Sequence, residues 1–267
     1  MRLATQEQNV PLILAVAPRS KFEDAEYLDI MCHEIGTPLT SIIGLSDIIA
    51  NVDCSPQKKS ECAEMLRDSS NMLMELMKNM LDYSKLEAGK IEIENIDFDL
   101  AKVVQEAAHI IAIRAEEKGL DLDVHVDNEI SSQFMGDPLR IRQILINLLS
   151  NAVKFTERGY IALYVTAKVD MHGKEKICIT VEDTGIGMNA ASLERIFDKY
   201  TQANSSISRR YGGTGLGLSI SQDLAHLMHG DITVKSWPGM GSHFSVSLPL
   251  IKASISLIAQ TSFKEAV

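Results

Sequence analysis

The sequence predicts a helical hairpin followed by an α/β sandwich. In residues 22–49 and again in 62–83, apolar residues recur at alternating three- and four-residue steps, the spacing of helices that pack along a seam. After Gly89, short stretches of alternating apolar and polar residues are mixed with helical segments. Such alternation is typical of half-buried antiparallel strands. We therefore expect one mixed sheet with helices packed on one of its faces.

The predicted hairpin has two seams. The first consists of Leu28, Met31, Ile35, Ile42, Leu45 and Ile49, with Pro38 between Ile35 and Ile42. The second consists of Cys62, Leu66, Ser69, Leu73, Leu76, Met80 and Tyr83. A short polar break at residues 51–57 predicts that the two helices run antiparallel. One hairpin leaves much of its apolar surface uncovered, so we expect two to form a four-helix bundle in a homodimer.

The predicted sandwich contains strands at residues 161–165, 177–182 and 244–248. One helix is expected to begin after Asp137, an N-cap followed by proline, and to run to about Thr156. Another is expected over residues 215–230. The span 189–212 is rich in Ser, Asn and Arg, and a loop of that length in a compact domain is typically a lid or a binding loop.

Composition narrows the class of protein. The formal net charge of -10 argues against a nucleic-acid partner, because nucleic-acid binders normally carry a basic footprint. The four cysteines form no CxxC pair and are predicted to be reduced thiols. The apolar stretch at residues 10–18 is far shorter than the roughly 20 residues of a membrane span, and it is not recognised as a signal peptide. We expect a cytoplasmic chain without direct membrane contact, with residues 1–21 unassigned and residues 251–267 a tail or linker.

The first candidate site lies on the first helix, at His33. This histidine is two residues from each of the seam residues Met31 and Ile35, about 200° round the helix, and should face away from the bundle core. Thr37 follows on the same face one turn later. Glu34 can accept the imidazole proton and leave a nitrogen lone pair for attack on phosphorus. A zinc helix of the HExxH type is excluded by Thr37, whereas an ordinary surface histidine remains the alternative.

The second candidate site is a polar stripe on the helix that follows Asp137. Asn147, Asn151 and Lys154 recur at i, i+4 and i+7 and share one face. An amide oxygen is a suitable ligand for Mg²⁺, and an ammonium neutralises phosphate charge, so the stripe suits a Mg²⁺-triphosphate. A solvated helix face is the alternative, although asparagine is a mediocre helix former.

A third candidate site follows the predicted strand 177–182. The carboxylate of Asp183 can accept a hydrogen bond from an exocyclic amine such as that of adenine, and Gly185 and Gly187 allow the backbone to turn closely around a base. Asp-Thr-Gly also occurs in aspartic proteases, but that chemistry needs two such carboxylates, and the sequence has one copy.

A fourth candidate site is a second glycine-rich segment, at residues 213–217. Its three glycines are spaced as GxGxG, which matches neither a dinucleotide fold nor a P-loop. A glycine run that opens a helix still offers N–H groups and a positive dipole end to phosphate.

Together, and in this order, these segments resemble the histidine kinase family of two-component signalling, over roughly residues 22–250. The matching segments are the H box at 33–39, the junction at 85–90, the N box at 147–155, the glycine boxes at 183–187 and 213–217, the phenylalanine box at 196–198 and the lid at 202–209.

The resemblance implies a dimerisation and histidine phosphotransfer domain over residues 22–90 and a catalytic ATP-binding domain of the Bergerat type over 97–250. His33 would be the phosphoacceptor and Glu34 its base. Thr37 would position water for hydrolysis of a phosphorylated partner. The partner would be the receiver domain of a response regulator, phosphorylated on aspartate.

The same resemblance assigns the nucleotide site, with ATP and Mg²⁺ as its ligands. Asn147 would ligate Mg²⁺, Asn151 and Lys154 would contact the phosphates, Phe155 would lie against adenine and Asp183 would bind its amine. The other residues assigned to the pocket and its lid are Gly185, Gly187, Arg209, Arg210, Gly213, Thr214, Gly215, Leu216 and Gly217.

The chain departs from the family pattern beside His33. Gly36 stands where the family usually has a basic residue, and glycine inside a helix costs roughly 0.5–1 kcal/mol relative to alanine. With Pro38 nearby, a kink is expected. Cys32 stands where serine is common. These changes leave the balance of kinase and phosphatase activity open.

Two other classes remain as alternatives. ATPases of the gyrase and chaperone type share the nucleotide fold but lack the hairpin, and a kinase-like scaffold would bind nucleotide without transferring phosphate. No sensory or receiver domain is recognised in the sequence. The chain is interpreted as a short kinase or as the core of a larger membrane-bound or hybrid kinase, whose stimulus the sequence does not reveal.

Overall fold

The structure is a computed structural model that describes residues 21–50, 55–128, 130, 133–169, 175–199 and 215–253. The side chains of residues 21–30, 33 and 175 lie outside this description. The chain divides into two compact units, Met1–Glu75 and Leu76–Val267. Within the described residues, no helix combines the length and apolarity that crossing a membrane requires. The described cysteines, Cys32, Cys62 and Cys178, are free thiols, and Cys54 lies outside the described residues.

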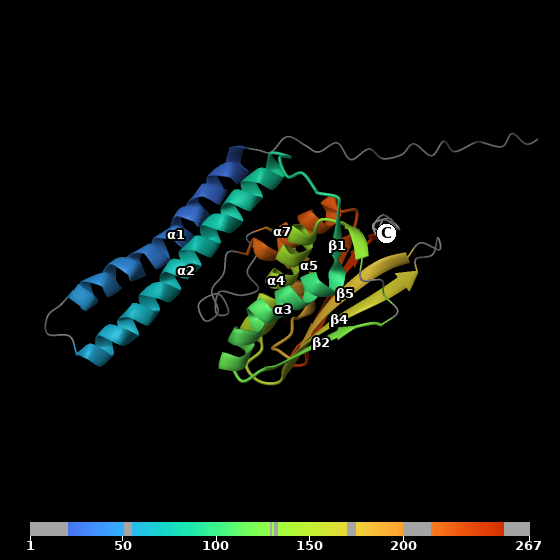
Figure 1. The fold of residues 1–267 in the computed structure, drawn as a ribbon. Helices are drawn as coiled ribbons and strands as arrows, with labels where there is room; N and C mark the ends of the chain where they lie inside the picture. The colour runs from blue at the N-terminus through green and yellow to red at the C-terminus, as the bar shows by residue number, and fades with distance from the viewer. Residues whose placement is uncertain are drawn as a thin grey trace, which may run out of the picture. The chain divides into compact units, whose positions relative to one another are not determined.

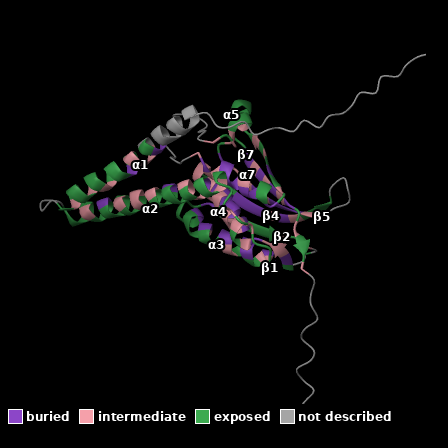
Figure 2. Cartoon of the chain, turned by 90° about the horizontal axis from the view of Figure 1, so that it is seen from above, coloured by how far each residue is buried: buried purple, intermediate pink, exposed green. Residues whose placement is uncertain are grey.

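The predicted helical hairpin is confirmed. Helices α1 (Lys21–Ala50) and α2 (Pro56–Glu87) run antiparallel, side by side (Figures 1 and 2). The buried positions of α2 are seam positions, at Cys62, Leu76 and Tyr83. The polar break predicted at residues 51–57 is too long, because α2 already begins at Pro56. Proline is tolerated in the first turn of a helix, where its missing N–H group would have no helical acceptor.

Helix α1 continues through Gly36 and Pro38 without interruption. Proline has no N–H group and cannot bond the carbonyl one turn before it. In the following turn, the hydroxyl of Thr40 donates to the Gly36 carbonyl over 2.8 Å and that of Ser41 to the Thr37 carbonyl over 3.2 Å. Side-chain hydroxyls thus add bonds to the helical carbonyls just beyond His33.

Five strands form the main sheet, in the order β2-β4-β5-β7-β6. Their bounds are β2 Asp121–Val126, β4 Tyr160–Val169, β5 Glu175–Asp183, β6 Asp231–Trp237 and β7 Gly241–Leu248. Strands β2 and β4 are parallel and the other pairs antiparallel, so the sheet is mixed, as predicted. One row of paired residues, Val165, Ile179, Val246 and Ile232, is buried across four strands.

Helices α3 (Leu100–Glu117), α4 (Pro138–Phe155) and α7 (Gly217–Leu227) cover one face of this sheet (Figure 1). Purple buried positions concentrate where the helices meet the strands (Figure 2). The expected helix over 215–230 is shorter than predicted. Gly215 takes a left-handed backbone with φ +66° before it, and His229 does so after it with φ 59°.

The prediction of a long loop over residues 189–212 is partly wrong. Helix α5 (Ala190–Arg195) occupies its first part, because the side chain of Asn189 accepts a hydrogen bond from the Ser192 N–H over 2.8 Å and caps the helix. Residues 200–214, which include the whole of the expected lid at 202–209, lie outside the described residues.

A second, three-stranded sheet was not expected. It consists of β1 (Ile96–Asp99), β3 (Gln133–Gly136) and β8 (Ile251–Lys252), in the order β1-β3-β8. Phe134 pairs with Phe98 on one side and with Lys252 on the other. The segment predicted as a tail therefore begins with a strand of the domain.

Candidate functional site

Helix α4 carries the polar stripe, and both of its ends are held by side chains. Asp137 is 2% exposed, and its two oxygens accept from the N–H groups of Arg140 over 3.0 Å and Glu94 over 3.1 Å. At the other end, the Lys118 ammonium donates to the carbonyls of Val153, Lys154 and Thr156 over 2.7, 3.2 and 3.2 Å. A cation at the C-terminus satisfies free carbonyls and opposes the negative end of the helix dipole.

The stripe has the arrangement that its spacing predicted. Asn147, Asn151 and Lys154 are half-buried on one face of α4. The apolar residues on the opposite side of the helix are buried against the sheet and the neighbouring helices: Ile141, Ile144, Leu145, Leu148, Leu149, Ala152 and Val153. The stripe is therefore a sheltered polar face and not a fully solvated one.

Asn147 joins α4 to the start of α7. Its Nδ2 donates to Oγ of the buried Ser221 over 2.8 Å. A Cβ on Gly217 would overlap Asn147 Oδ1, so this oxygen lies against the first turn of α7. With its nitrogen held by Ser221, the amide presents its oxygen as an acceptor, and an amide oxygen fits the hard ligands that Mg²⁺ prefers. Ser221 was not predicted from the sequence, although its place four residues after Gly217 was a signal.

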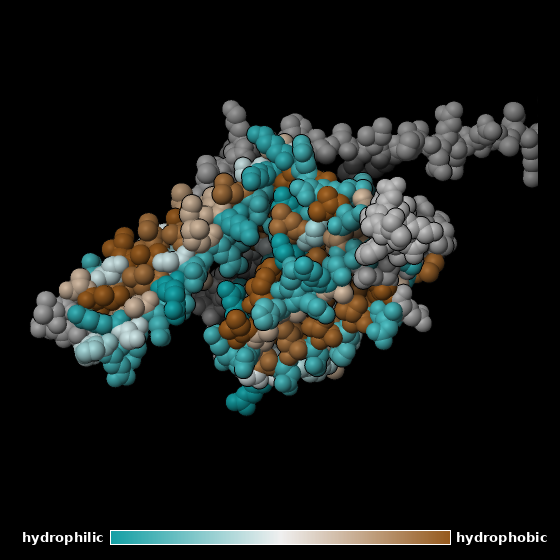
Figure 3. Space-filling model, viewed as in Figure 1, coloured by the Kyte–Doolittle hydropathy of each residue, from teal (hydrophilic) through white to brown (hydrophobic). Residues whose placement is uncertain are grey.

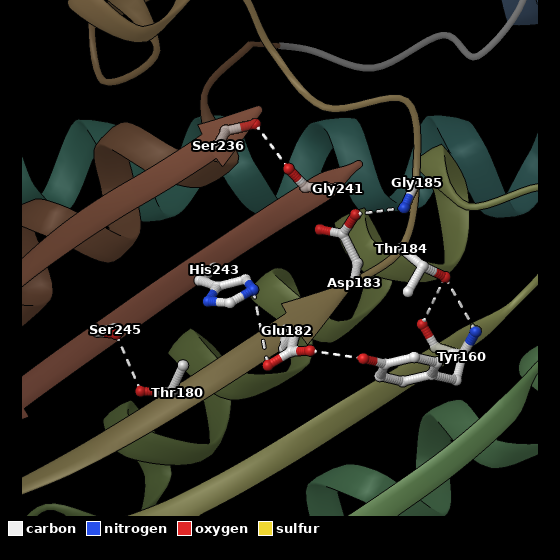
Figure 4. A network of polar contacts seen from close by, with 10 residues as sticks. All are labelled: Tyr160, Thr180, Glu182, Asp183, Thr184, Gly185, Ser236, Gly241, His243 and Ser245. Atoms are coloured by element: carbon white, nitrogen blue, oxygen red, sulfur yellow. Dashed lines mark hydrogen bonds and ion pairs between the residues drawn. The ribbon is translucent and has the colours of Figure 1, made fainter. Parts of the chain in front are cut away.

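Asp183 ends strand β5 and is only 6% exposed. Figure 4 shows its carboxylate accepting the Gly185 N–H, over 2.8 Å. Burial raises the pKa of Asp183 above its ordinary value, and hydrogen bonds from the backbone of Gly185 and Ser242 oppose that rise. The site thus holds a desolvated acceptor close to a glycine turn.

The glycine turn also contacts the end of α4. The Ile186 N–H donates to the Phe155 carbonyl over 3.2 Å. A Cβ on Gly185 would clash with the same carbonyl oxygen, so glycine is required here by close packing. The turn after Asp183 is in this way placed beside Phe155, whose ring lies 5.0 Å from the Lys154 ammonium.

The other side of the same turn is attached to strand β4. The Thr184 hydroxyl accepts from the Tyr160 N–H over 3.0 Å, while the Thr184 N–H donates to the Tyr160 carbonyl over 3.3 Å. The Tyr160 phenol donates to Glu182 over 2.7 Å, and this carboxylate raises the pKa of Tyr160. Nε2 of His243 lies 3.6 Å from Oε2 of Glu182 (Figure 4).

The remaining predicted site residues fall into three groups. On α1, Glu34 is half-buried and Thr37 exposed. At the start of α7, Gly215 has a positive φ and Leu216 is fully buried, so the Leu216 side chain belongs to the core. The predicted residues outside the description are the His33 side chain, Arg209, Arg210, Gly213 and Thr214.

Comparison with known families matches both units. Residues 24–89 match the His Kinase A (phospho-acceptor) domain. Residues 136–252 match the family described as Histidine kinase-, DNA gyrase B-, and HSP90-like ATPase. The second match alone would include gyrase-type ATPases, but the first adds the phospho-acceptor hairpin. The chain belongs to the histidine kinase family of two-component signalling.

Individual histidine kinases align with most of this chain. It is 39% identical over 239 residues to the signal transduction histidine-protein kinase BarA of Escherichia coli K12, an alignment that covers 89% of the chain and 26% of BarA. It is 39% identical over 248 residues to the sensor protein GacS of Pseudomonas syringae, covering 92% of the chain and 27% of GacS. The chain thus spans about a quarter of the length of these kinases.

Solved structures of histidine kinases share the fold. The crystal structure of full-length ShkA in complex with AMPPNP matches with a TM-score of 0.63 and 29% identity, over 86% of this chain and 46% of ShkA. The Acinetobacter baumannii histidine kinase AdeS matches with a TM-score of 0.63 and 21% identity, over 81% of this chain and 97% of that protein, which supports the fold alone.

Proposed function

We propose that this histidine kinase transfers the γ-phosphate of ATP to its own His33 and then passes it to an aspartate of a response regulator. The observation that carries the proposal is the position of α4. Asn147 on this helix meets Gly217 at the start of α7, and Phe155 meets the glycine turn after Asp183. The groups that we propose to bind the phosphates and the base therefore lie along one helix.

This arrangement supports a nucleotide site along α4. We propose that the Asp183 carboxylate accepts a hydrogen bond from the adenine amine and that the Phe155 ring lies against the base. Asn151 and Lys154 would contact the phosphates further along the stripe. A Mg²⁺ ion held at the Asn147 oxygen would neutralise phosphate charge. The complex of ShkA with AMPPNP supports nucleotide binding by this fold.

The transfer step needs three groups. A nitrogen of His33 would form a bond to the γ-phosphorus, while the bond from that phosphorus to its bridging oxygen breaks and ADP leaves. Glu34 would accept the imidazole proton. Thr37, exposed one turn after His33, is proposed to position a water molecule for hydrolysis of the partner's phosphoaspartate, because water has no covalent tether and needs a hydrogen-bonding side chain.

We also propose a homodimer formed through the hairpin. Brown apolar side chains lie along it in Figure 3. Large apolar residues of the hairpin that remain exposed in one chain are Leu39, Ile43, Ile48, Met65, Met72, Met74, Met77 and Leu81. A second hairpin would cover such surface, and the relatives of this chain include a hybrid kinase and a sensor protein.

Incubation with γ-labelled ATP tests the function. The full chain should take up label that is lost in acid and stable in base, as expected for a phosphohistidine. His33→Gln should take up none. His109→Gln, which changes an exposed histidine on α3, should be labelled normally. Labelling of the His33→Gln protein, or a loss of labelling in both variants, would overturn the assignment of the phosphoacceptor.

A further inference from the structure

The turn after Asp183 is held on a third side by the β6–β7 hairpin. The Gly239 N–H donates to the Ile186 carbonyl over 2.8 Å, and the Met188 N–H donates to Ser236 Oγ, also over 2.8 Å. These two bonds flank Gly187, whose backbone is left-handed with φ +62°. A Cβ added to Gly187 would overlap the Trp237 carbonyl oxygen. Backbone and side-chain groups of the hairpin therefore fix the end of the turn.

Ser236 is the centre of this contact. Its hydroxyl accepts from Met188 and donates to the Gly241 carbonyl over 3.0 Å, a bond drawn in Figure 4. It also lies 2.9 Å from the hydroxyl of the buried Ser242. One side chain thus ties the glycine turn to both strands of the hairpin.

The same hairpin reaches Asp183 itself. A Cβ on Gly241 would overlap the Asp183 carbonyl oxygen, and the backbone N–H of Ser242 is hydrogen-bonded to the Asp183 carboxylate. Ser236 bonds both the strand that contacts Asp183 and the residue that closes the turn, Met188. It therefore sets the distance between the start and the end of the segment that is proposed to hold the base.

We propose that Ser236 is a positioning residue for the adenine site, acting through Met188 and Asp183. The inference rests on the proposed nucleotide site. Alanine at this position would remove the acceptor of the Met188 N–H and the donor to Gly241, and the turn would be ordered less well before the base binds. Nucleotide affinity should fall, whereas the chemical step, which takes place at the phosphate end, should be little changed.

Titration calorimetry with ADP tests this in the full chain. Because a hydrogen bond contributes about 1 kcal/mol, Ser236→Ala should weaken ADP binding about fivefold. At saturating ATP its rate of autophosphorylation should stay within about twofold of wild type, a change in KM and not in kcat. Ser236→Thr, which keeps the hydroxyl, should restore affinity. Ser245→Ala is the matched control, because its hydroxyl is in the same hairpin but bonds Thr180, at 2.9 Å.

Asp183→Asn separates this inference from the proposed site. If Asp183→Asn weakens ADP binding and Ser236→Ala does not, the role of Ser236 is wrong while the site stands. If neither variant weakens binding, both are wrong. Equal losses in Ser236→Ala and Ser245→Ala, with matching falls in the melting temperature of the nucleotide-free protein, would also reject positioning in favour of general hairpin stability.

Discussion

At Asp183, the proposed role in nucleotide binding and the contribution to folding stability depend on pH in opposite directions. Its burial penalises the charged form and raises its pKa, so the folded protein holds this proton more strongly than the unfolded chain does. The resulting contribution to folding stability is present below the ordinary pKa of the group and is lost as pH rises through the raised pKa. Nucleotide binding, for which we propose this carboxylate as an acceptor, should change in the opposite direction.

We predict that ADP affinity falls as pH is lowered through the raised pKa of Asp183, above the ordinary aspartate range. Protonation replaces an acceptor with a donor opposite the adenine amine. Calorimetric titrations across the acidic range should show this fall in the wild type. Asp183→Asn provides the comparison, because ADP titrates identically in both experiments. A variant with the same pH dependence as wild type would assign the fall to another group.

At the scale of elements, α4 depends on one buried carboxylate at its N-terminus. One oxygen of Asp137 caps the helix at Arg140, and the other holds the Glu94 N–H in the segment that leads into β1. Asp99 gives α3 a simpler cap, in which Oδ1 accepts the Lys102 N–H over 3.0 Å. The two caps allow the second bond of Asp137 to be measured separately.

We predict that Asp137→Asn lowers the free energy of unfolding by about 1 kcal/mol and Asp137→Ala by about 2 kcal/mol or more. Asparagine keeps a capping oxygen but cannot accept from Glu94 through its NH₂ group. Urea denaturation measures both changes. In the control Asp99→Asn the stability should change by less than about 0.5 kcal/mol, because asparagine caps a helix as well as aspartate does. Equal effects of asparagine at both positions would mean that the Glu94 bond adds nothing.

At the scale of the whole molecule, the exposed apolar surface of the hairpin bears on assembly. Ile43 on α1 is 56% exposed, and Ile113 on α3 is 60% exposed. The two side chains are chemically identical and similarly accessible in one chain, but only Ile43 lies on the hairpin. Substituting each of the two residues in turn therefore distinguishes an assembly surface from ordinary exposed apolar area.

We predict a homodimer at micromolar concentration, observable by light scattering. Ile43→Glu should shift the protein toward monomer, because a charge would be buried in the bundle, whereas Ile113→Glu should leave the dimer intact. A monomeric wild type would contradict the prediction, and so would equal effects of the two substitutions.

The local features of the site were predictable from sequence, and the contacts between distant segments were not. The Asp137 cap and the Asn147 stripe each depend on residues close together in the sequence. Over such short distances, helical periodicity determines which side chains share a face. Lys118, Ser221 and Ser236 act on partners 35, 74 and 48 residues away, at Val153, Asn147 and Met188. Such pairings depend on how helices and strands pack, which spacing along the chain does not encode.

One missed element shows a similar limit on a smaller scale. Asn189 carried an N-cap signal for α5, but the following stretch of Ser, Asn and Arg was interpreted as loop. The two residues of β8 are too few for any alternation to be visible, and their pairing with β3 identifies them as a strand. Short elements of this kind are recognised by their neighbours in space.

The small β1-β3-β8 sheet has a consequence for how the domain can be connected. Its first and last strands both pair with β3, so the strands by which the chain enters and leaves lie about 10 Å apart across the sheet, two strand spacings. A short bridge could join Ile96 to Lys252, and new ends could be opened at an exposed loop elsewhere. The domain therefore has the geometry that tolerates circular permutation, and a pull on its two connections would load this small sheet first.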